Sequence, residues 1–318
     1  MKKLLVLFTG GTISCKCERV MSASTDGGYR LIERYRAQTG DDTCFECHAP
    51  MEILSENQTL STMQTLCDAL WQTDFSLYRG IIITHGSDTL SYISALLALI
   101  FGGAGLPIVL TAANLPIEDA RSNGPDNFAA AVTLVKSGLC GVYTVYGTDK
   151  KAAIYPGDAI CEADRYFERF SPFGKPFGEI CAGKVRIDNP PMFAQTTVAP
   201  MKFTKSILVL KNYPGTNYDA YNLESAAAVL HLLYHSGTAC VCGESTDFLR
   251  FAERCRAEKV PLYVLPFRDA QADVYASAAA MRNSGVRSLP QMSTERAYAK
   301  LLIEQNGGVL REIDKSSV

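Results

Sequence analysis

Hydroxyl and carboxyl side chains follow two apolar runs in the N-terminal half of the chain. Residues 9–12 (TGGT) follow the run 4–8, and residues 84–88 (THGSD) follow the run 80–83. A hydroxyl becomes a useful nucleophile only when a neighbouring group takes or polarises its proton. Glycines beside these hydroxyls let the backbone approach a ligand closely. The two segments suit chemistry by a hydroxyl on a small ligand, although a hydroxyl and an acid before a helix are more often an N-cap.

A parallel sheet is the element that we expect to position these segments. Short apolar runs without alternation are typical of strands buried on both faces, as in parallel sheets. Such runs occur at residues 4–8, 80–83, 107–110 and 142–146, and helices are expected at 90–101 and 127–136. In open α/β sheets, ligands bind beyond the carboxyl ends of the strands. We therefore expect both polar segments to lie at one edge of one sheet.

The alternation of strands and helices predicts an α/β protein with two domains. The larger N-terminal domain, residues 1–187, is expected to hold a doubly wound, mostly parallel sheet and the catalytic residues. Residues 188–205 contain a proline pair and are interpreted as a linker. Residues 206–318 are expected to form a smaller C-terminal α/β domain, with a helix over 223–237 and a strand over 238–243.

Composition and charge exclude several classes of function. The chain has 318 residues, a net charge of -2 and a pI near 6.1, so no basic stripe for nucleic acid or an anionic membrane is expected. No apolar run reaches the roughly 18 residues of a transmembrane helix. The N-terminus, MKKLLVLF, begins like an export signal, but its apolar run is shorter than the roughly 7 to 15 residues needed. Eleven cysteines, an odd number, favour reduced thiols in a cytoplasm.

Several segments resemble the bacterial-type L-asparaginases. FTGGTI at 8–13 and ITHGSDTL at 83–90 look like the two signature motifs of that family, in the right order and at the right distance. The segments at 107–132, 208–215 and 291–301 are similar to later parts of the family. The spacing and the short N-terminal apolar run favour the cytoplasmic, type I branch.

The resemblance implies an amidohydrolase that converts L-asparagine to L-aspartate and ammonia through a threonine acyl-enzyme. It implies no metal or organic cofactor, a small amino acid amide as substrate, and a homodimer or homotetramer. Thr9 would be the nucleophile, and Tyr29 would help to activate it. Ser55 and Asp88 would hold the carboxylate and the amine of the substrate. Asp88 and Ser87, which stands where the family normally has a threonine, would also be catalytic.

Other residues are expected to complete substrate binding. A tetrahedral oxyanion needs hydrogen-bond donors, and backbone N–H groups near Gly11 and Gly86 are of the right type. Thr12 adds a hydroxyl at the same strand end. Glu56 stands where relatives carry a small polar or amide residue, and we hypothesise that it changes which amide is preferred.

The chain departs from the family pattern in its expected general base. The family lysine that helps to activate the nucleophile aligns with Ile160, and no lysine lies between Lys151 and Lys175. Loss of a general base typically lowers the rate by about 10²- to 10⁴-fold. In addition, CGESTDF at 242–248 replaces a glycine and asparagine stretch that reaches a neighbouring subunit's site in the family. The absent lysine favours an alternative function, in which a catalytically weakened relative binds an amino acid as a sensor or as an amidotransferase-type subunit. The presence of Thr9, Tyr29, Ser55 and Asp88 favours the amidohydrolase.

Three clusters of metal-binding residue types have simpler interpretations. Cys15, Cys17, Cys44 and Cys47 have the pairwise spacing of a four-thiolate zinc site, but buried free cysteines are common. CFECH at 44–48 matches a haem-attachment pattern that is used outside the cytoplasm. His231 and His235 would form a metal-binding i, i+4 pair on a helix, although solvated histidines are commoner there. His85, at a strand end, is expected to be structural or orienting.

Overall fold

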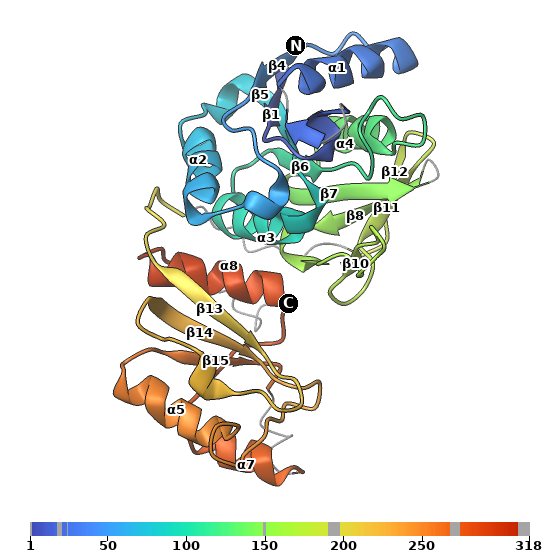
Figure 1. The fold of residues 1–318 in the computed structure, drawn as a ribbon. Helices are drawn as coiled ribbons and strands as arrows, with labels where there is room; N and C mark the ends of the chain where they lie inside the picture. Colours follow the sequence, from blue (N-terminus) through green and yellow to red (C-terminus); the bar gives the residue numbers. More distant parts are fainter. Residues whose placement is uncertain are drawn as a thin grey trace. The chain divides into compact units, whose positions relative to one another are not determined.

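The computed structural model describes residues 2–17, 21–23, 25–148, 151–189, 198–267 and 274–310. The chain divides into two compact units, one containing Met1–Pro200 and the other Met201–Gly308 (Figure 1). The boundary between them falls inside the segment 188–205 that the sequence suggested as a linker. Residues 190–197 of that segment lie outside the described residues.

An eight-stranded sheet forms the centre of the first unit. Its strand order is β12-β11-β8-β7-β6-β5-β1-β4. The neighbours among β7, β6, β5, β1 and β4 pair in parallel. The pairs β7–β8, β8–β11 and β11–β12 are antiparallel. The strands are β1 (Lys3–Phe8), β4 (Phe45–His48), β5 (Tyr78–Thr84), β6 (Pro107–Thr111), β7 (Gly141–Thr148), β8 (Lys151–Pro156), β11 (Gly178–Cys181) and β12 (Lys184–Ile187). Two small antiparallel pairs lie outside it: β2 (Cys15–Cys17) with β3 (Met21–Ala23), and β9 (Ile160–Cys161) with β10 (Ser171–Pro172).

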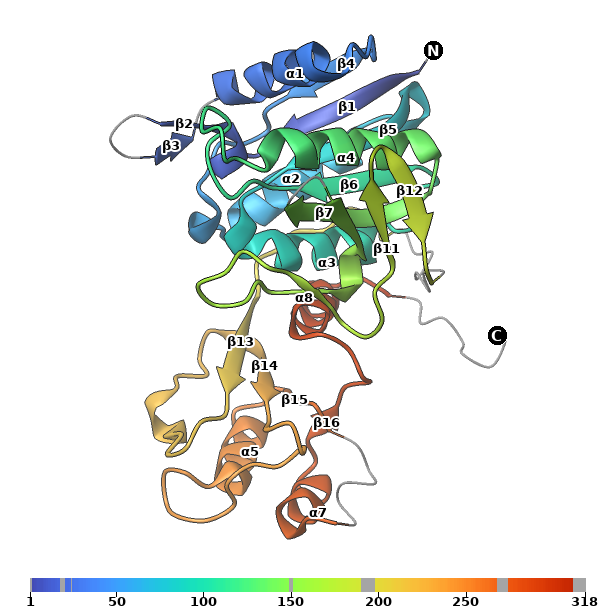
Figure 2. The same cartoon turned by 90° about the vertical axis from the view of Figure 1, so that its right-hand side faces the viewer.

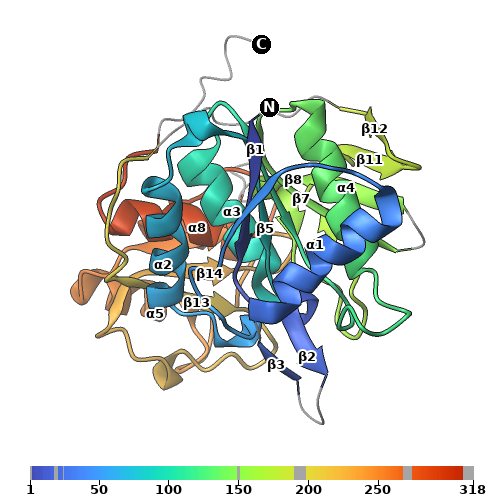
Figure 3. The same cartoon turned by 90° about the horizontal axis from the view of Figure 1, so that it is seen from above.

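Helices cover both faces of this sheet, as a doubly wound fold requires. Figure 3 shows α2 (Leu60–Trp71) and α3 (Leu90–Phe101) on one face and α1 (Thr25–Thr39) and α4 (Gly124–Ser137) on the other. Figure 2 shows α1 and α4 beside each other on the face of the sheet that they both cover. Side chains from β1, α1 and α4, including Val6, Leu31 and Phe128, form a buried core between these helices and the sheet. The predicted fold class, the four apolar strands and both expected helices are confirmed.

The second unit is a smaller α/β layer structure. Its four-stranded parallel sheet has the order β13-β14-β15-β16. The strands are β13 (Ser206–Lys211), β14 (Ala226–Leu232), β15 (Leu262–Leu265) and β16 (Arg287–Ser288). Figure 1 shows α8 (Thr294–Gln305) over one face, in contact with β13 and β14, and α5 (Phe248–Ala257) and α7 (Ala276–Arg282) over the other.

The helix expected over 223–237 is wrong, because its centre is the strand β14. A short apolar run between turn residues fits a buried strand as well as a buried helix, and periodicity alone does not separate them. Here Ala228, Val229 and Leu230 are fully buried between parallel neighbours β13 and β15. The expected i, i+4 pair of His231 and His235 is therefore also wrong, since His231 lies in a strand.

The strand expected over 238–243 is also wrong. These residues form an irregular connection, in which Cys240 and Cys242 are exposed rather than packed in a core. Their sulfur atoms lie 3.5 Å apart. Hydrogen bonds with the Cys242 backbone and side chain lower the pKa of the Cys240 thiol. Among the described helices, none has both the length and the apolar character needed to span a bilayer.

Candidate active site

The two polar segments meet because β1 and β5 are neighbouring parallel strands. Phe8, the last residue of β1, is paired with Thr84, the last residue of β5. Thr9 and His85 therefore follow the carboxyl ends of two strands that end side by side. The Thr9 N–H donates to the Thr84 carbonyl oxygen at 3.2 Å. The expected placement of both segments at one edge of one sheet follows from this register.

Two glycines allow the segments to come into backbone contact. Gly11 has φ +73°, and a Cβ added to it would lie 2.4 Å from the Gly86 nitrogen. A Cβ added to Gly86 would lie 2.4 Å from Ser55 Oγ, so Ser55 reaches the same point from a third segment. The Gly11 N–H donates to the Ile53 carbonyl oxygen at 2.8 Å, which anchors this third segment. That N–H group is therefore engaged in holding the site together.

A buried chain of hydrogen bonds begins at the Thr9 hydroxyl. Thr9 Oγ1 lies 2.6 Å from His85 Nδ1 and 2.8 Å from the Thr84 carbonyl oxygen. His85 Nε2 lies 3.1 Å from Thr89 Oγ1, which in turn donates to the Ser55 carbonyl oxygen at 3.2 Å. Thr9 and His85 are essentially inaccessible to solvent. His85 therefore contacts the expected nucleophile directly.

The tautomer of His85 determines which group donates in each of these hydrogen bonds. Burial lowers the pKa of His85 to about 4, so the imidazole is neutral near pH 7 and has one donor and one acceptor nitrogen. With the proton on Nε2, His85 donates to Thr89, Thr89 donates to Ser55, and Nδ1 accepts the proton of the Thr9 hydroxyl. With the proton on Nδ1, Thr9 instead donates to the Thr84 carbonyl oxygen. The first arrangement points the Thr9 hydroxyl at an unprotonated acceptor nitrogen.

The structure brings together the two residues expected to hold the substrate. Ser55 Oγ donates to Asp88 Oδ2 at 3.1 Å. We call Thr9, Ser55 and Asp88 the strand-end cluster. Within it Ser55 is buried and Asp88 is exposed, so the Asp88 carboxylate lies on the solvent side of the cluster. Glu56 is exposed on the short helix Ser55–Asn57, and Thr12 is half-buried at the start of the short helix Thr12–Ser14.

Tyr29 and Thr9 make no hydrogen bond to each other in this structure. Tyr29 belongs to α1 and is 54% exposed. Its ring lies against Phe8, the residue before Thr9, with ring centroids 6.0 Å apart. The role of Tyr29 in activating Thr9 stays a prediction.

Ser87 has a partner that the sequence did not reveal. Ser87 Oγ donates to Glu168 Oε1 at 2.9 Å, and the Tyr146 hydroxyl donates to Glu168 Oε2 at 2.6 Å. Glu168 is 81 residues from Ser87 along the chain. No local motif marks Glu168, because the contact arises only when the loop after β9 folds back over the sheet edge.

The position expected to correspond to the family lysine is apolar and enclosed. Ile160 begins β9 and is fully buried. Lys151, the lysine that most nearly precedes Ile160 in the sequence, forms an ion pair with Glu179 at 2.6 Å. Lys150 lies outside the described residues.

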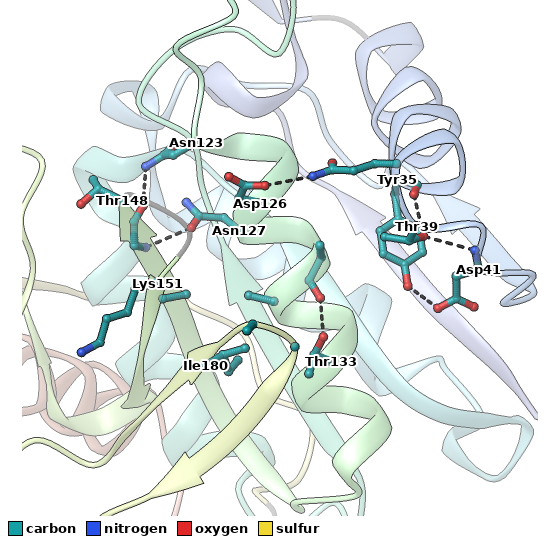
Figure 4. A pocket seen from close by; sticks show the side chains of 17 residues that line it. Tyr35, Thr39, Asp41, Asn123, Asp126, Asn127, Thr133, Thr148, Lys151 and Ile180 are labelled. Carbon is teal, nitrogen blue, oxygen red and sulfur yellow. Dashed lines mark hydrogen bonds between the residues drawn. The ribbon is translucent and has the colours of Figure 1, made fainter.

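A cavity of about 630 Å³ lies elsewhere in the first unit. Figure 4 shows it between α1, α4 and the strands β7, β8 and β11, with Tyr35, Asn127 and Lys151 among its lining residues. Several lining groups bond to one another: Asn123 Nδ2 donates to the Gly147 carbonyl oxygen at 2.8 Å, and the Gly147 N–H donates to Asn127 Oδ1 at 2.9 Å. None of its lining residues belongs to the strand-end cluster of Thr9, Ser55 and Asp88.

The cysteine-based zinc site, for which the sequence favours the simpler interpretation of free cysteines, stays untested. Cys44 and Cys47 are free thiols, and burial raises the pKa of Cys47 to about 11. The side chains of Cys15 and Cys17 lie outside the described residues. Within the described residues, no three side chains of metal-binding type gather around a common point. In the CFECH segment, His48 Nε2 lies 3.0 Å from Glu46 Oε1.

From the burial of two histidines we predict how the free energy of unfolding depends on pH. Burial lowers the pKa of both His85 and His231 from 6.5 to about 4. Between these values the unfolded chain binds protons at both histidines and the folded chain does not, so the free energy of unfolding falls as pH falls. Each histidine contributes at most about 3 kcal/mol across this window.

We expect urea unfolding to give a lower free energy of unfolding at about pH 5 than at about pH 7. His231→Phe removes one of the two imidazoles, so it should reduce the pH dependence by about half, relative to the wild-type chain. A free energy of unfolding that stays constant over this interval would show that the two imidazoles titrate alike in the folded and unfolded states.

The chain is similar to known asparaginases and to a component of an amidotransferase. A family model described as "Asparaginase, N-terminal" matches residues 3–189. The L-asparaginase of Thermococcus kodakarensis is 34% identical over 154 residues, which cover 45% of this chain and 44% of that protein, less than half of its length. A glutamyl-tRNA(Gln) amidotransferase subunit from Methanosphaera stadtmanae is 24% identical over 95% of this chain and 71% of its own length.

Solved structures share the fold. The thermostable L-asparaginase from Thermococcus kodakarensis superposes with a TM-score of 0.78 at 22% identity, over 96% of this chain and 93% of that chain. The probable cytoplasmic L-asparaginase from Campylobacter jejuni superposes with a TM-score of 0.72 at 17% identity, over 95% and 94%. These superpositions support the fold, and the family model supports the membership. With its signature segments joined at one sheet edge and its N-terminal residues 3–189 matching the family model, the chain belongs to the asparaginase family.

Proposed function

We propose that the chain is an amidohydrolase that converts L-asparagine to L-aspartate and ammonia through an acyl-enzyme on Thr9. The observation that carries this proposal is the contact between the Thr9 hydroxyl and His85 Nδ1 at 2.6 Å. A hydroxyl nucleophile needs a base or polarising partner within hydrogen-bond reach, and His85 Nδ1 lies within that reach of Thr9. The family membership gives the reaction class.

Ser55 and Asp88 suit the ends of an amino acid substrate. An ammonium group is held by a carboxylate, and a carboxylate is held by hydroxyl or N–H donors. Asp88 is an exposed carboxylate, and the Ser55 hydroxyl beside it lies within the same cluster as Thr9. We assign Asp88 to the substrate amine and Ser55 to the substrate carboxylate, with Gly86, Thr12 and Glu56 lining the rest of the site.

In the proposed first half of the reaction, Thr9 Oγ1 attacks the amide carbon. The Thr9 proton moves to His85 Nδ1 and from there to the amide nitrogen, which leaves as ammonia when the C–N bond breaks. Because Thr9 is fully buried, substrate reaches it only when the residues that cover it move. In the second half, water breaks the ester bond to Thr9 and releases the acid.

A second candidate function follows from the apolar side chain at Ile160. A buried isoleucine cannot act as a base at the position that aligns with the family lysine. The similarity to the amidotransferase protein over 95% of the chain is compatible with a role as one component of a larger assembly. In this alternative the site binds an amino acid with little or no turnover.

Ammonia release separates the two functions. L-Asparagine, L-glutamine and D-asparagine should be assayed side by side with the purified protein. The proposal predicts turnover of L-asparagine, and a preference for another amide would support a role for Glu56 in substrate choice. Negligible rates on all three, together with a higher melting temperature in the presence of an amino acid, would favour the binding protein.

We further propose a cytoplasmic location and a homodimer or homotetramer. The eleven cysteines support the location, since free thiols persist in reducing compartments. The relative from Campylobacter jejuni is described as probably cytoplasmic. Light scattering of the purified protein would measure the oligomeric state.

A further inference from the structure

The loop between β9 and β10 carries a carboxylate to the candidate active site. β9 and β10 pair in antiparallel fashion and close the base of this loop. Phe170 anchors its end: its ring packs edge-on against Tyr146, with centroids 5.0 Å apart, and its carbonyl oxygen accepts from the Tyr155 hydroxyl at 3.1 Å. Glu168 lies two residues before this anchor, so its position is set by buried aromatic contacts.

Both oxygens of Glu168 are occupied by hydroxyl donors. Ser87 Oγ lies 2.9 Å from Oε1, and the Tyr146 hydroxyl lies 2.6 Å from Oε2. Burial, and then the hydrogen bond to Glu168, raise the pKa of Tyr146, so Tyr146 keeps its proton and remains a donor. An ionised carboxylate only accepts, so Ser87 must direct its own proton at Glu168. The lone pairs of Ser87 are then left to accept a proton from another molecule.

Ser87 lies next to a member of the strand-end cluster along the chain. It follows Gly86, whose nitrogen would lie 2.4 Å from a Cβ on Gly11, and it precedes Asp88, which is bonded to Ser55. Ser87 is therefore the chain neighbour of Asp88, which we assign to the substrate amine. The described contacts thus connect the substrate region to Glu168 through one hydroxyl.

We propose that Ser87 and Glu168 form a proton relay that activates the hydrolytic water in the second half of the reaction. Tyr146 is a positioning residue that fixes the orientation of the Glu168 carboxylate. The inference rests on the proposed function, since it concerns the hydrolysis of the Thr9 ester. In this relay the general base for the hydrolysis is the Glu168 carboxylate, on the loop between β9 and β10.

The atoms balance without any co-reactant. The water oxygen attacks the ester carbon, its proton moves to Ser87 Oγ, and the Ser87 proton moves to Glu168 Oε1. The tetrahedral intermediate then collapses, and the bond between the carbonyl carbon and Thr9 Oγ1 breaks. The proton held by Glu168 returns through Ser87 to the departing Thr9 oxygen. The net change is ester plus water to acid plus the Thr9 hydroxyl.

A purely structural role for Glu168 makes a different prediction. In that case Glu168 only ties the loop to Ser87 and Tyr146, and any neutral side chain with the same hydrogen bonds would serve. Glu168→Gln provides this test, because its amide oxygen accepts from Ser87 and its amide nitrogen can donate to the Tyr146 oxygen, but it cannot hold the proton.

Asp164→Asn is the matched control. Asp164 belongs to the same loop, and its carboxylate pairs with Arg169 at 2.9 Å instead of with Ser87. Both variants remove one negative charge from the loop, and only Glu168→Gln removes the proposed proton acceptor.

The experiment measures the first-turnover ammonia burst, the steady-state kcat over a range of pH, and the intact mass of the protein during turnover. For Glu168→Gln we expect a burst close to one equivalent, a kcat lower by about 10²- to 10⁴-fold, acyl-enzyme accumulation in the mass spectrum, and loss of the acid limb of the kcat profile. Asp164→Asn should behave like the wild-type protein.

Two results would overturn the relay while leaving the proposed function intact. One is a Glu168→Gln variant with wild-type kcat and pH profile. The other is a variant in which burst and steady state fall together with an unchanged pH profile, which is the signature of a structural tie. A wild-type protein that releases no ammonia from any amide would overturn the relay and the proposed function together.

Discussion

Thr9→Ala is expected to abolish ammonia release from L-asparagine. The variant removes the oxygen that forms the acyl-enzyme, and loss of a nucleophile typically lowers kcat by about 10⁴-fold or more. Binding should survive, because the Ser55 and Asp88 side chains do not depend on the Thr9 hydroxyl for their hydrogen bond. The measurements are kcat for ammonia release and the thermal shift produced by L-aspartate.

Thr9→Ser is the matched variant. It keeps the hydroxyl and its contact with His85 Nδ1 and loses only a methyl group, so we expect it to retain measurable turnover. Thr9→Ala also leaves His85 Nδ1 buried without its partner, which costs about 1–3 kcal/mol, so the folded state of both variants should be verified by circular dichroism. Turnover by folded Thr9→Ala at the wild-type rate would exclude Thr9 as the nucleophile.

The sequence predicted the parts of the site that depend on local patterns. Residues 4–8 and 80–83 are apolar runs long enough only for buried strands, and the polar residues after them meet because β1 and β5 pair in register. Adjacent parallel strands of one sheet end at the same edge, so the contact between Thr9 and His85 follows from two local predictions. What the sequence did not show was that His85 would touch Thr9 directly.

The features that the sequence missed depend on long-range packing. Glu168 reaches Ser87 because Phe170 packs on Tyr146, and neither contact has a local signature. Residues 223–237 are rich in alanine and leucine, which favour helices, yet burial between β13 and β15 makes the centre of this segment a strand. Intrinsic preference of the residues is overridden there by the sheet.

Gly11→Ala is expected to have the second-largest effect, on both stability and activity. The added Cβ would lie 2.4 Å from the Gly86 nitrogen and 2.5 Å from its Cα, so backbone must move. Gly11 also has φ +73°, a conformation that costs an L-residue about 1–2 kcal/mol. Overpacking adds about 1–3 kcal/mol, so we expect the free energy of unfolding to fall by about 2–5 kcal/mol.

The displacement of the Gly86 backbone in Gly11→Ala should also lower the catalytic rate. Gly86 lies between His85, which contacts Thr9, and Ser87, which contacts Glu168. A shift of this backbone by about 1 Å changes the distances of both hydroxyls from a bound amide, and misplacement of that size can lower the rate by about 10²-fold. We expect kcat/KM for L-asparagine to fall by about this factor in folded Gly11→Ala.

Gly40→Ala separates backbone strain from the clash. Gly40 follows α1 with φ +67°, close to the value at Gly11, but an added Cβ there meets no atom within 4 Å. Its substitution should therefore lower the free energy of unfolding by only about 1–2 kcal/mol and leave kcat/KM unchanged. The difference between the two variants in urea unfolding measures the contact between Gly11 and Gly86. Equal losses in both would mean that the two signature segments can separate without disturbing the fold, and that their contact does not hold Thr9 in place.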